Sequence, residues 1–193
     1  MFTGIIEQLA TIKKIVKENE NLHITLEADF VNELKIDQSV AHNGICLTVV
    51  AIENNTYTVT AIQETILKTT ISFWDLTTKV NIERCMQMNG RLDGHIVQGH
   101  VDTTGKCTRI EDQNGSWKYT FEYSDKQVTV DKGSITINGV SLTVVDSESQ
   151  AFSVCIIPYT YEHTNFHQLK CGDPINLEFD IIGKYVAKLI GNN

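Results

Sequence analysis

Short runs of alternating or β-branched apolar residues dominate the hydrophobic pattern of this chain. Clear examples are residues 24–28, 48–52 and 56–62. Because the side chains of a β-strand alternate between two faces, such runs predict half-buried strands. Short helical turns are expected at 29–34 and 64–69, but no long helical pattern alternates with the strands. The chain is therefore predicted to be all-β and not a doubly wound α/β fold.

The pattern repeats at a constant offset of 95 residues. Residues 39–71 match residues 134–166 without a gap, and roughly a third of the pairs are identical. The same offset aligns two shorter blocks, residues 80–83 with 175–178 and residues 4–7 with 99–102. One offset shared by three separated blocks indicates an internal duplication.

Duplication predicts two domains with the same fold. We expect an N-terminal barrel from residues 1–95 and a C-terminal barrel from residues 96–181. Six or so short strands in about 90 residues suit a closed barrel, because closure removes exposed sheet edges. The expected architecture is two tandem closed six-stranded Greek-key β-barrels. Turn-forming residues at 54–55 and 112–115 are expected at matching places in the two halves.

The tail, residues 182–193, departs from both repeats. Its apolar residues recur at helical spacing and predict a short C-terminal amphipathic helix; they are Ile182, Tyr185, Val186, Leu189 and Ile190. An isolated helix this short is marginal in water, so it must pack on something. Docking on its own barrel and contact with another subunit both remain open.

Composition narrows the partners and the compartment. The net charge is −8 and no run of lysine and arginine occurs, which argues against nucleic acid as a partner. No stretch approaches about 18 consecutive apolar residues and no secretory signal is visible, so neither a membrane span nor secretion is expected. The five cysteines are odd in number and widely spaced. They favour a reduced, cytoplasmic protein without a disulfide framework.

Four motifs carry the chemical signal. They are M-F-T-G-I-I-E at residues 1–7, N-G-I-C-L-T-V at 43–49, G-H-I-V-Q-G-H-V-D at 94–102 and N-G-V-S-L-T at 138–143. Together they resemble the riboflavin synthase family, the alpha-chain type built from duplicated lumazine-binding barrels. The resemblance extends over residues 1–187.

The resemblance implies a dismutation that needs no cofactor and no metal. Two molecules of 6,7-dimethyl-8-ribityllumazine react, and a four-carbon unit passes from one to the other. The products are riboflavin and 5-amino-6-(ribitylamino)pyrimidinedione. The resemblance also implies a homotrimer with each active site between the first barrel of one subunit and the second barrel of a neighbour. It suggests lumazine synthase as a further partner.

A reaction between two identical substrates with unequal roles predicts two pockets that agree in recognition and differ in reactivity. Thr48 and Thr143 occupy equivalent positions in the repeat, as do Thr65 and Thr160, and they suit recognition by hydroxyl groups. Three equivalent pairs differ where the motifs lie: Cys46 with Ser141, Ile5 with His100, and Cys85 with Asp180.

Several residues are candidates for catalysis. Cys46 could act as a thiolate if its pKa were lowered, or it could position the substrate, or it could be a packed thiol. His100 follows Gly99 in a junction loop, and an imidazole could move a proton from a substrate methyl group. Asp180 either caps the tail helix or belongs to the reacting site.

By resemblance, Ser39, Ser141 and Thr143 join the catalytic candidates, and Lys132 is a weaker ligand candidate. The resemblance extends the substrate contacts to short segments of both halves: Gly4, Ile5, Ile6, Cys46, Leu47, Thr48, Thr60, Ala61, Ile62, Gln63, Glu64, Thr65, Gly99, His100, Val101, Lys132, Ser141, Leu142, Thr143, Cys155, Ile156, Ile157, Pro158, Tyr159 and Thr160.

A zinc site is not expected, because His95 with His100, and His163 with His167, lack a third ligand at recognisable spacing. The alternative function is that of the antenna proteins of luminous bacteria, which keep the barrels and bind a lumazine or flavin without turning it over. Because the motif residues are retained here, the sequence favours the enzyme.

Overall fold

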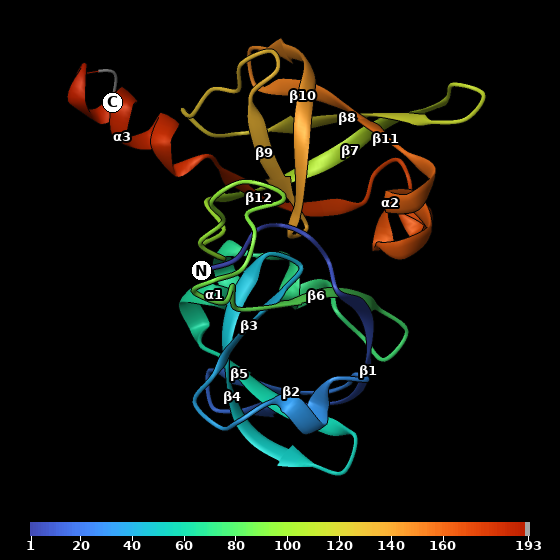
Figure 1. The fold of residues 1–193 in the computed structure, drawn as a ribbon, viewed down its shortest axis with the longest axis vertical. Coiled ribbons are helices and arrows are strands. Elements are labelled where there is room, and N and C mark those ends of the chain that lie inside the picture. The colour runs from blue at the N-terminus through green and yellow to red at the C-terminus, as the bar shows by residue number, and fades with distance from the viewer. Residues whose placement is uncertain (192–193) are drawn as a thin grey trace.

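Two closed barrels of antiparallel strands, one from each half of the chain, make up the computed structural model, which describes residues 1–191 (Figure 1). The first barrel contains β1 (Gln8–Glu18), β2 (Asn21–Glu27), β3 (Ser39–His42), β4 (Ile45–Glu53), β5 (Thr56–Ala61) and β6 (Lys79–Arg84). The second contains β7 (Thr103–Asp112), β8 (Trp117–Tyr123), β9 (Ser134–Ile137), β10 (Val140–Glu148), β11 (Ala151–Ile156) and β12 (Pro174–Phe179).

The strand order demonstrates the duplication directly. Around the first barrel the order is β1-β2-β5-β4-β3-β6, and around the second the equivalent strands follow the same circular order. The prediction of two closed six-stranded barrels is therefore confirmed.

Bulges at equivalent places help each sheet to close. The register shifts between Ile12 and Lys14 in β1 and between Val49 and Ala51 in β4. The second barrel has shifts at the positions 95 residues later, in β7 and in β10. A bulge bends its strand and increases the local twist, which a small closed barrel requires.

Each barrel has its own core because alternate residues of the strands point inward. In β5, for example, Tyr57, Val59 and Ala61 are fully buried, while the residues between them are only partly buried. The second core is more aromatic, with Phe121, Phe152 and Phe166 packed at tilted and edge-on angles. A polar-out, apolar-in pattern of period two is what the sequence predicted.

Short helices follow β5 and β11 at matching positions. They are α1 (Gln63–Lys68) with η2 (Thr70–Phe73), and α2 (Pro158–His163) with η3 (Asn165–Gln168). A further turn, η1 (Val31–Glu33), precedes β3. The helical turns expected at 29–34 and 64–69 are thus confirmed.

The C-terminal helix α3 (Ile181–Leu189) extends away from the second barrel (Figure 1). The side chain of Asp180 caps it by accepting a hydrogen bond from the backbone N–H of Ile182 at 2.9 Å. The amphipathic helix is confirmed, although it starts one residue earlier than expected, and residues 192–193 of the predicted tail lie outside the described residues. None of the helices in the described part of the chain is both long and apolar enough to cross a bilayer.

The expectation that the turns at 54–55 and 112–115 match each other is wrong. Residues 54–55 join β4 to β5, whereas 112–115 joins β7 to β8. The counterpart of Asn114 is Asn19 in the β1–β2 turn, and both have a positive φ, of 56° and 54°. The same few residue types, such as Asn and Gly, occur in hairpin turns generally, so turn composition cannot identify which hairpins are equivalent.

Candidate functional site

The two N-G motifs form tight hairpin turns that bring the barrels together. Asn43 and Gly44 join β3 to β4 with φ values of 47° and 80°, and Asn138 and Gly139 repeat this geometry with 46° and 83°. Positive φ at both central residues is the requirement of a type I′ turn. A Cβ on Gly44 would lie 2.9 Å from the backbone nitrogen of Gly139, and a Cβ on Gly139 would lie 2.7 Å from that of Gly44. The two turns therefore meet about a local twofold axis.

Asparagines extend this symmetric contact. The Asn81 side chain donates to the carbonyl of Asn138 at 2.8 Å, and Asn176, its repeat equivalent, donates to the carbonyl of Asn43 at 2.9 Å. All four residues are buried, so these bonds satisfy polar groups that would otherwise be costly at the interface. Phe2 pairs with Val97, again its own repeat equivalent, on the same axis.

The segment that precedes each barrel contacts the other barrel; we call residues 2–6 and 97–101 the exchanged segments. The carbonyl of Gly99 accepts a hydrogen bond from the backbone N–H of Cys46 in the first barrel at 2.8 Å. The carbonyl of Gly4 accepts one from the backbone N–H of Ser141 in the second barrel, also at 2.8 Å. Ile6 packs against the second core and Val101 against the first. Each half of the chain thus contributes a backbone segment to the candidate site of the other half.

A buried carboxylate anchors each exchanged segment. Glu83 accepts hydrogen bonds from the backbone N–H groups of Thr3 and Gly4 at 2.7 and 3.0 Å. Its equivalent Glu178 accepts from the backbone N–H groups of Gln98 and His100 at 2.6 and 2.8 Å. Burial raises the pKa of Glu178 to about 7, although the two N–H groups oppose the rise.

We call the candidate site around Cys46 in the first barrel the first half-site, and the one around Ser141 in the second barrel the second half-site. Cys46 is half-buried on β4, opposite Ala41 of the neighbouring strand β3 and near the side chain of Ser39 on the same strand. Burial raises the pKa of the Cys46 thiol, and the nearby Ser39 side chain only partly opposes this. A raised pKa leaves the thiol protonated at neutral pH, so the thiolate interpretation lacks the lowered pKa that it required.

Two other candidates lie close to this cysteine. The side chain of Cys85 donates to the carbonyl of Ser39 at 3.3 Å. The side chain of His100 is exposed, while its backbone is tied to Glu178. Ser39, Cys46 and the 99–101 segment are therefore gathered at one place.

Ser141 lies at the centre of the second half-site, on β10. Its hydroxyl lies 2.6 Å from Nδ1 of His95, and Nε2 of the same ring lies 3.1 Å from the hydroxyl of Thr136. Asp180 is close enough for its charge to favour protonation of His95, but burial outweighs it and lowers the pKa of His95. Lys132 is exposed in the loop before β9, with its backbone N–H donating to the carbonyl of Val144 at 2.9 Å.

The residues predicted to contact the substrate fall into groups by the burial of their side chains. Thr48 and Thr143 are exposed on the outer faces of β4 and β10, and Thr60 and Cys155 also point away from the cores. In contrast, the side chains of a second group are buried in or packed against the cores, so their backbone groups are what the sites can use: Leu47, Ala61, Leu142 and Ile156.

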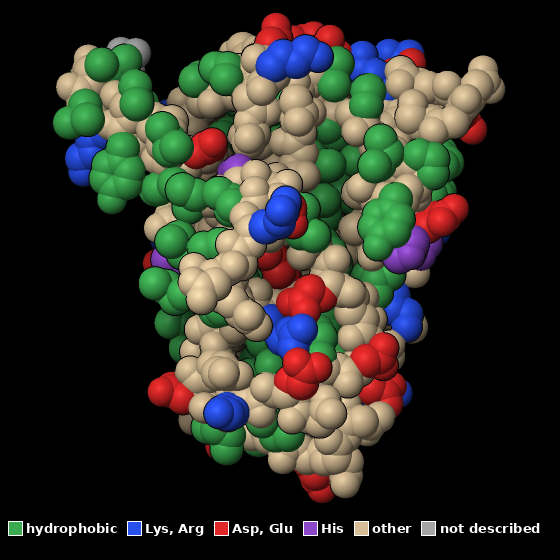
Figure 2. All heavy atoms as spheres, viewed as in Figure 1, with side chains coloured by type: hydrophobic (Ala, Val, Ile, Leu, Met, Phe, Trp, Pro, Cys, Tyr) green, Lys and Arg blue, Asp and Glu red, His purple; other side chains and the backbone are tan. Residues whose placement is uncertain are grey.

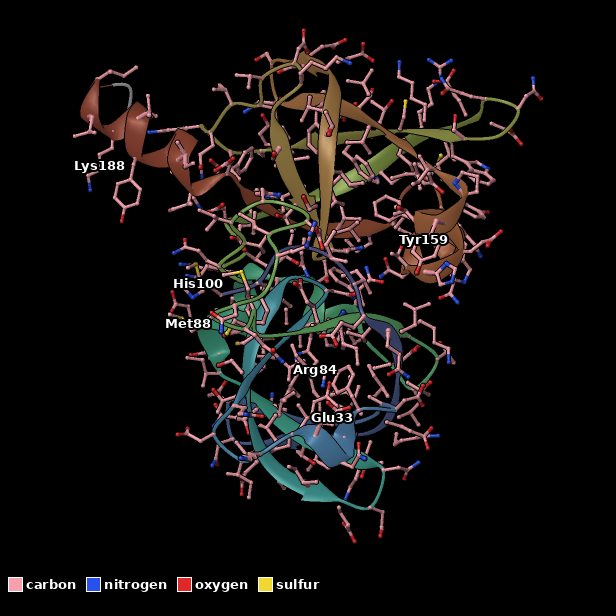
Figure 3. All side chains as sticks on the ribbon, in the orientation of Figure 1. Glu33, Arg84, Met88, His100, Tyr159 and Lys188 are labelled. Atoms are coloured by element: carbon pink, nitrogen blue, oxygen red, sulfur yellow. The ribbon has the colours of Figure 1, made fainter. Side chains whose placement is uncertain are left out.

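The remaining predicted contact residues lie where β5 and β11 lead into α1 and α2. Ile62 and Ile157 are exposed N-cap residues, and Thr65 and Thr160 are partly buried one turn further on. Gln63, Glu64, Pro158 and Tyr159 are exposed in the first turns. Figure 1 shows α1 and α2 on opposite sides of the molecule, and Figure 3 places His100 and Tyr159 on opposite sides as well.

Two surface hollows lie near the first barrel. One, of about 670 Å³, is lined by Ser39 and Cys85 on one side and by Arg84 on another. Arg84 is paired with Glu7 at 2.6 Å and with Glu33 at 2.7 Å. Figure 3 labels Arg84 and Glu33 on the first barrel, and Figure 2 shows basic and acidic groups side by side on this face. The charge of Arg84 is therefore already neutralised.

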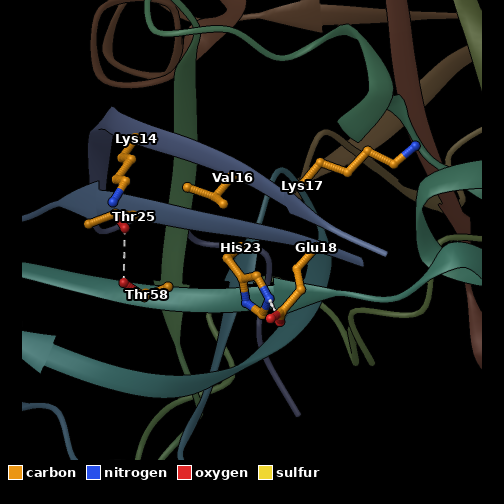
Figure 4. Close-up of a pocket in the computed structure, with 7 residues that line it drawn as sticks. All are labelled: Lys14, Val16, Lys17, Glu18, His23, Thr25 and Thr58. Atoms are coloured by element: carbon orange, nitrogen blue, oxygen red, sulfur yellow. Dashed lines mark hydrogen bonds and ion pairs between the residues drawn. The ribbon is translucent and has the colours of Figure 1, made fainter. Parts of the chain in front are cut away.

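The other hollow, of about 400 Å³, lies on the outer wall of the first barrel (Figure 4). Thr25 and Thr58 bond to each other at 2.9 Å, and His23 bonds to Glu18 at 2.9 Å. Among residues 1–191, no group of three or more His, Cys, Asp or Glu side chains is placed to hold a metal ion.

The sequence did not identify four residues that shape these sites: His95 as a partner of Ser141, Thr136, Glu83 and Glu178. A signal for the two glutamates was present, because V-N-I-E at 80–83 and I-N-L-E at 175–178 repeat an acid within an apolar strand. No local pattern links His95 to Ser141.

Comparison with known proteins agrees with the duplicated fold. The chain matches a model of the lumazine binding domain twice, over residues 3–85 and 98–180. It is 41% identical to a riboflavin synthase of Actinobacillus pleuropneumoniae and 37% identical to one of Bacillus subtilis. Both matches cover 98% of this chain and 90% of the relative.

Solved structures agree on the fold. LumP complexed with 6,7-dimethyl-8-(1'-D-ribityl) lumazine superposes with a TM-score of 0.84, at 23% identity, over 92% of this chain and 98% of that one. LumP complexed with riboflavin gives a TM-score of 0.86 at 22% identity, over 93% and 99%. At such low identity this likeness supports the double-barrel fold alone.

Proposed function

The chain belongs to the riboflavin synthase family, with two lumazine-binding domains, and from this premise we propose that it converts two molecules of 6,7-dimethyl-8-ribityllumazine into riboflavin and 5-amino-6-(ribitylamino)pyrimidinedione. The observation that carries the proposal is the pair of like sites with unlike reactive groups. Cys46 and Ser141 occupy the same place in the two barrels, and His100 borders only the first.

The unequal groups suit the unequal roles of the two substrates. One molecule must lose a proton from a methyl group and receive the four-carbon unit, and the other must donate it. The reaction is a dismutation, so every atom of the two substrates reappears in the products and no oxidant is required. His100, exposed beside Cys46, is the proposed proton-transfer group. The proposed recognition groups are the hydroxyls of Thr48, Thr143, Thr65 and Thr160 and the backbone around them.

We propose residues 1–95 and 96–181 as the two domains, and a homotrimer as the active assembly. Helices α1 and α2, which border the two proposed half-sites, lie on opposite sides of one chain (Figure 1), so two bound molecules would not meet within it. A neighbouring chain could bring a second barrel to the first. Helix α3 offers an apolar face for assembly, since Ile182, Tyr185 and Leu189 are exposed.

The proposed compartment is the cytoplasm, where the five free cysteines would stay reduced. Association with lumazine synthase is part of the proposal and is tested by co-sedimentation of the two proteins. The antenna-type function is not favoured, because the relatives that are 32–41% identical are named riboflavin synthases.

The deciding experiment uses purified full-length protein treated with a chelator. Supplied with the dimethyl-ribityllumazine alone, it should form riboflavin, seen by absorbance, with one pyrimidinedione for each riboflavin. A protein that binds the lumazine without product, or that needs an added metal, nicotinamide or ATP, would contradict the proposal.

A further inference from the structure

A buried histidine joins the second half-site to the loop between the barrels. His95 is 8% exposed, and both of its ring nitrogens face hydroxyl groups, with Nδ1 2.6 Å from Ser141 and Nε2 3.1 Å from Thr136. Thr136 is 1% exposed, and within residues 1–191 its hydroxyl has no hydrogen-bond partner other than this ring. The ring is therefore held from both ends.

The first half-site has no such arrangement. At the 95-residue offset, Ala41 occupies the position of Thr136 and Cys46 that of Ser141. The hydrogen-bonded chain from Thr136 through His95 to Ser141 is thus specific to the second barrel, where it distinguishes two sites that are otherwise built alike.

We propose that His95 is a positioning residue of the second half-site, which holds the Ser141 hydroxyl in one orientation toward a bound lumazine. This rests on the proposed function, because it assigns a task to a group of that same site.

The argument is one of hydrogen-bond directions. A neutral imidazole has one N–H and one lone pair, so it donates to one hydroxyl and accepts from the other. If the ring donates to Ser141, the hydroxyl keeps its proton and one lone pair for a ligand. If the ring accepts from Ser141, the hydroxyl keeps both lone pairs. A serine hydroxyl without a partner rotates between three staggered positions, so fixing it in the transition state costs rotational freedom. A hydroxyl that His95 already holds avoids that entropic cost.

The chain offers variants that separate this role from packing. His95→Asn can place an amide nitrogen near the position of Nδ1 and keep the contact with Ser141. His95→Leu fills similar space without any hydrogen bond. Thr136→Val leaves the ring in place but removes the bond that holds its far end. Ser141→Ala removes the group that His95 is proposed to position.

We expect His95→Leu to lower kcat about tenfold with little change in KM, and His95→Asn to stay within about threefold of the wild type. In the Ser141→Ala background, His95→Leu should cause no further loss, because residues that act through one another are not additive. Equal losses in both backgrounds, or no loss from His95→Leu, would overturn the proposal. If His95→Leu does not fold, Thr136→Val is judged by the same comparison.

A second measurement does not depend on turnover. In protein with 15N-labelled histidine, the ring resonances of His95 should move in Ser141→Ala, while those of His42, which bonds to Tyr57 at 2.8 Å, should stay in place. Unmoved His95 resonances would sink the proposed role. A wild type that forms no riboflavin would instead contradict the proposed function and leave this spectroscopic test standing.

Discussion

Single residues at equivalent positions of the repeat differ where their surroundings differ. Cys46 is a protonated, half-buried thiol beside Ser39, while Ser141 is bonded to a buried imidazole. Neither environment creates an obvious nucleophile. The roles proposed for side chains are therefore proton transfer by His100 and orientation of Ser141 by His95, and not nucleophilic attack by the Cys46 thiol.

His100→Ala should lower kcat by about 10²–10⁴-fold while changing substrate affinity much less, because a proton-transfer group contributes on that scale. Its side chain is exposed and only its backbone is bound to Glu178, so the substitution leaves the anchor intact. Steady-state kinetics and a fluorescence titration with riboflavin measure the two effects. His167→Ala, at another exposed histidine, is the control. Weak binding with normal turnover at saturation would assign His100 to recognition.

Stability should depend on pH through Glu178. Its pKa of about 7 in the folded protein lies above the ordinary value of 4.5, so the folded state binds the proton more tightly. The stabilisation is full below about pH 4.5 and is lost as the pH rises through 7. The difference in unfolding free energy between wild type and Glu178→Gln should therefore fall from pH 5 to pH 8, measured by urea unfolding. Glu148→Gln, at an exposed carboxylate, serves as the control, and a difference that is constant with pH refutes the assignment.

Among the elements, the exchanged segments depend on close backbone approach. Gly99 has a φ of 78°, and a Cβ there would lie 2.7 Å from the Cβ of Cys46. Gly4 repeats this against Ser141, at 2.6 Å. Both conformational strain and overlap oppose any side chain at these two positions.

Gly99→Ala should destabilise the protein by about 2 kcal/mol or more and lower activity, since the 99–101 segment would be displaced from Cys46. Gly183→Ala in α3 meets open space and should be neutral or stabilising by up to about 1 kcal/mol. Thermal unfolding of the two variants gives the comparison. Equal effects would mean that the close approach at Gly99 has no energetic consequence.

Helix α3 is held at its start but has an uncovered apolar face. Lys184 pairs with Asp102 at 2.8 Å, and both side chains are largely buried, so the first turn is fixed to the second barrel. Figure 2 shows apolar side chains gathered on the projecting helix.

Truncation after Asp180 should give smaller species in sedimentation and reduced activity, because the stripe that includes Tyr185 and Leu189 would be lost. Lys188→Ala, on the same helix, should leave assembly unchanged. If the truncated chain kept the assembly state and activity of the full chain, α3 would not mediate assembly.

The two halves of the molecule are related by a local twofold axis, so a fragment that contains one half could pair with a second copy of itself. Phe2 and Val97 pair across the axis, as do the turns at Gly44 and Gly139. A single half supplies one partner of each contact, so two copies of the same half could form an equivalent symmetric contact.

Residues 1–95 should fold alone, pair into a symmetric dimer and bind riboflavin, with residues 2–6 of one copy covering Cys46 of the other. The fragment should not catalyse, because it lacks His100, Ser141 and Asp180, which belong to the second half. Sedimentation, ligand fluorescence and riboflavin formation test this. Residues 8–95, which lack the exchanged segment, are the control and should bind more weakly. Full activity from residues 1–95 would show that one kind of site is sufficient.

The sequence by itself determined the strands, the duplication and the tail helix. Alternation of period two is visible within a single segment, and the 95-residue offset appears when the sequence is compared with itself. Neither pattern requires knowledge of the fold. They also placed Cys46 and Ser141 at equivalent positions.

Only the tertiary structure decided which barrel each segment serves. Repeat alignment equates Gly4 with Gly99 but carries no information about the surface on which either lies, and the structure places each on the other half. It also joined His95 to Ser141, 46 residues away, and buried Glu178 beneath His100. These contacts arise from packing two barrels about an axis, and packing is set by shape and burial across the whole chain, which no local pattern encodes.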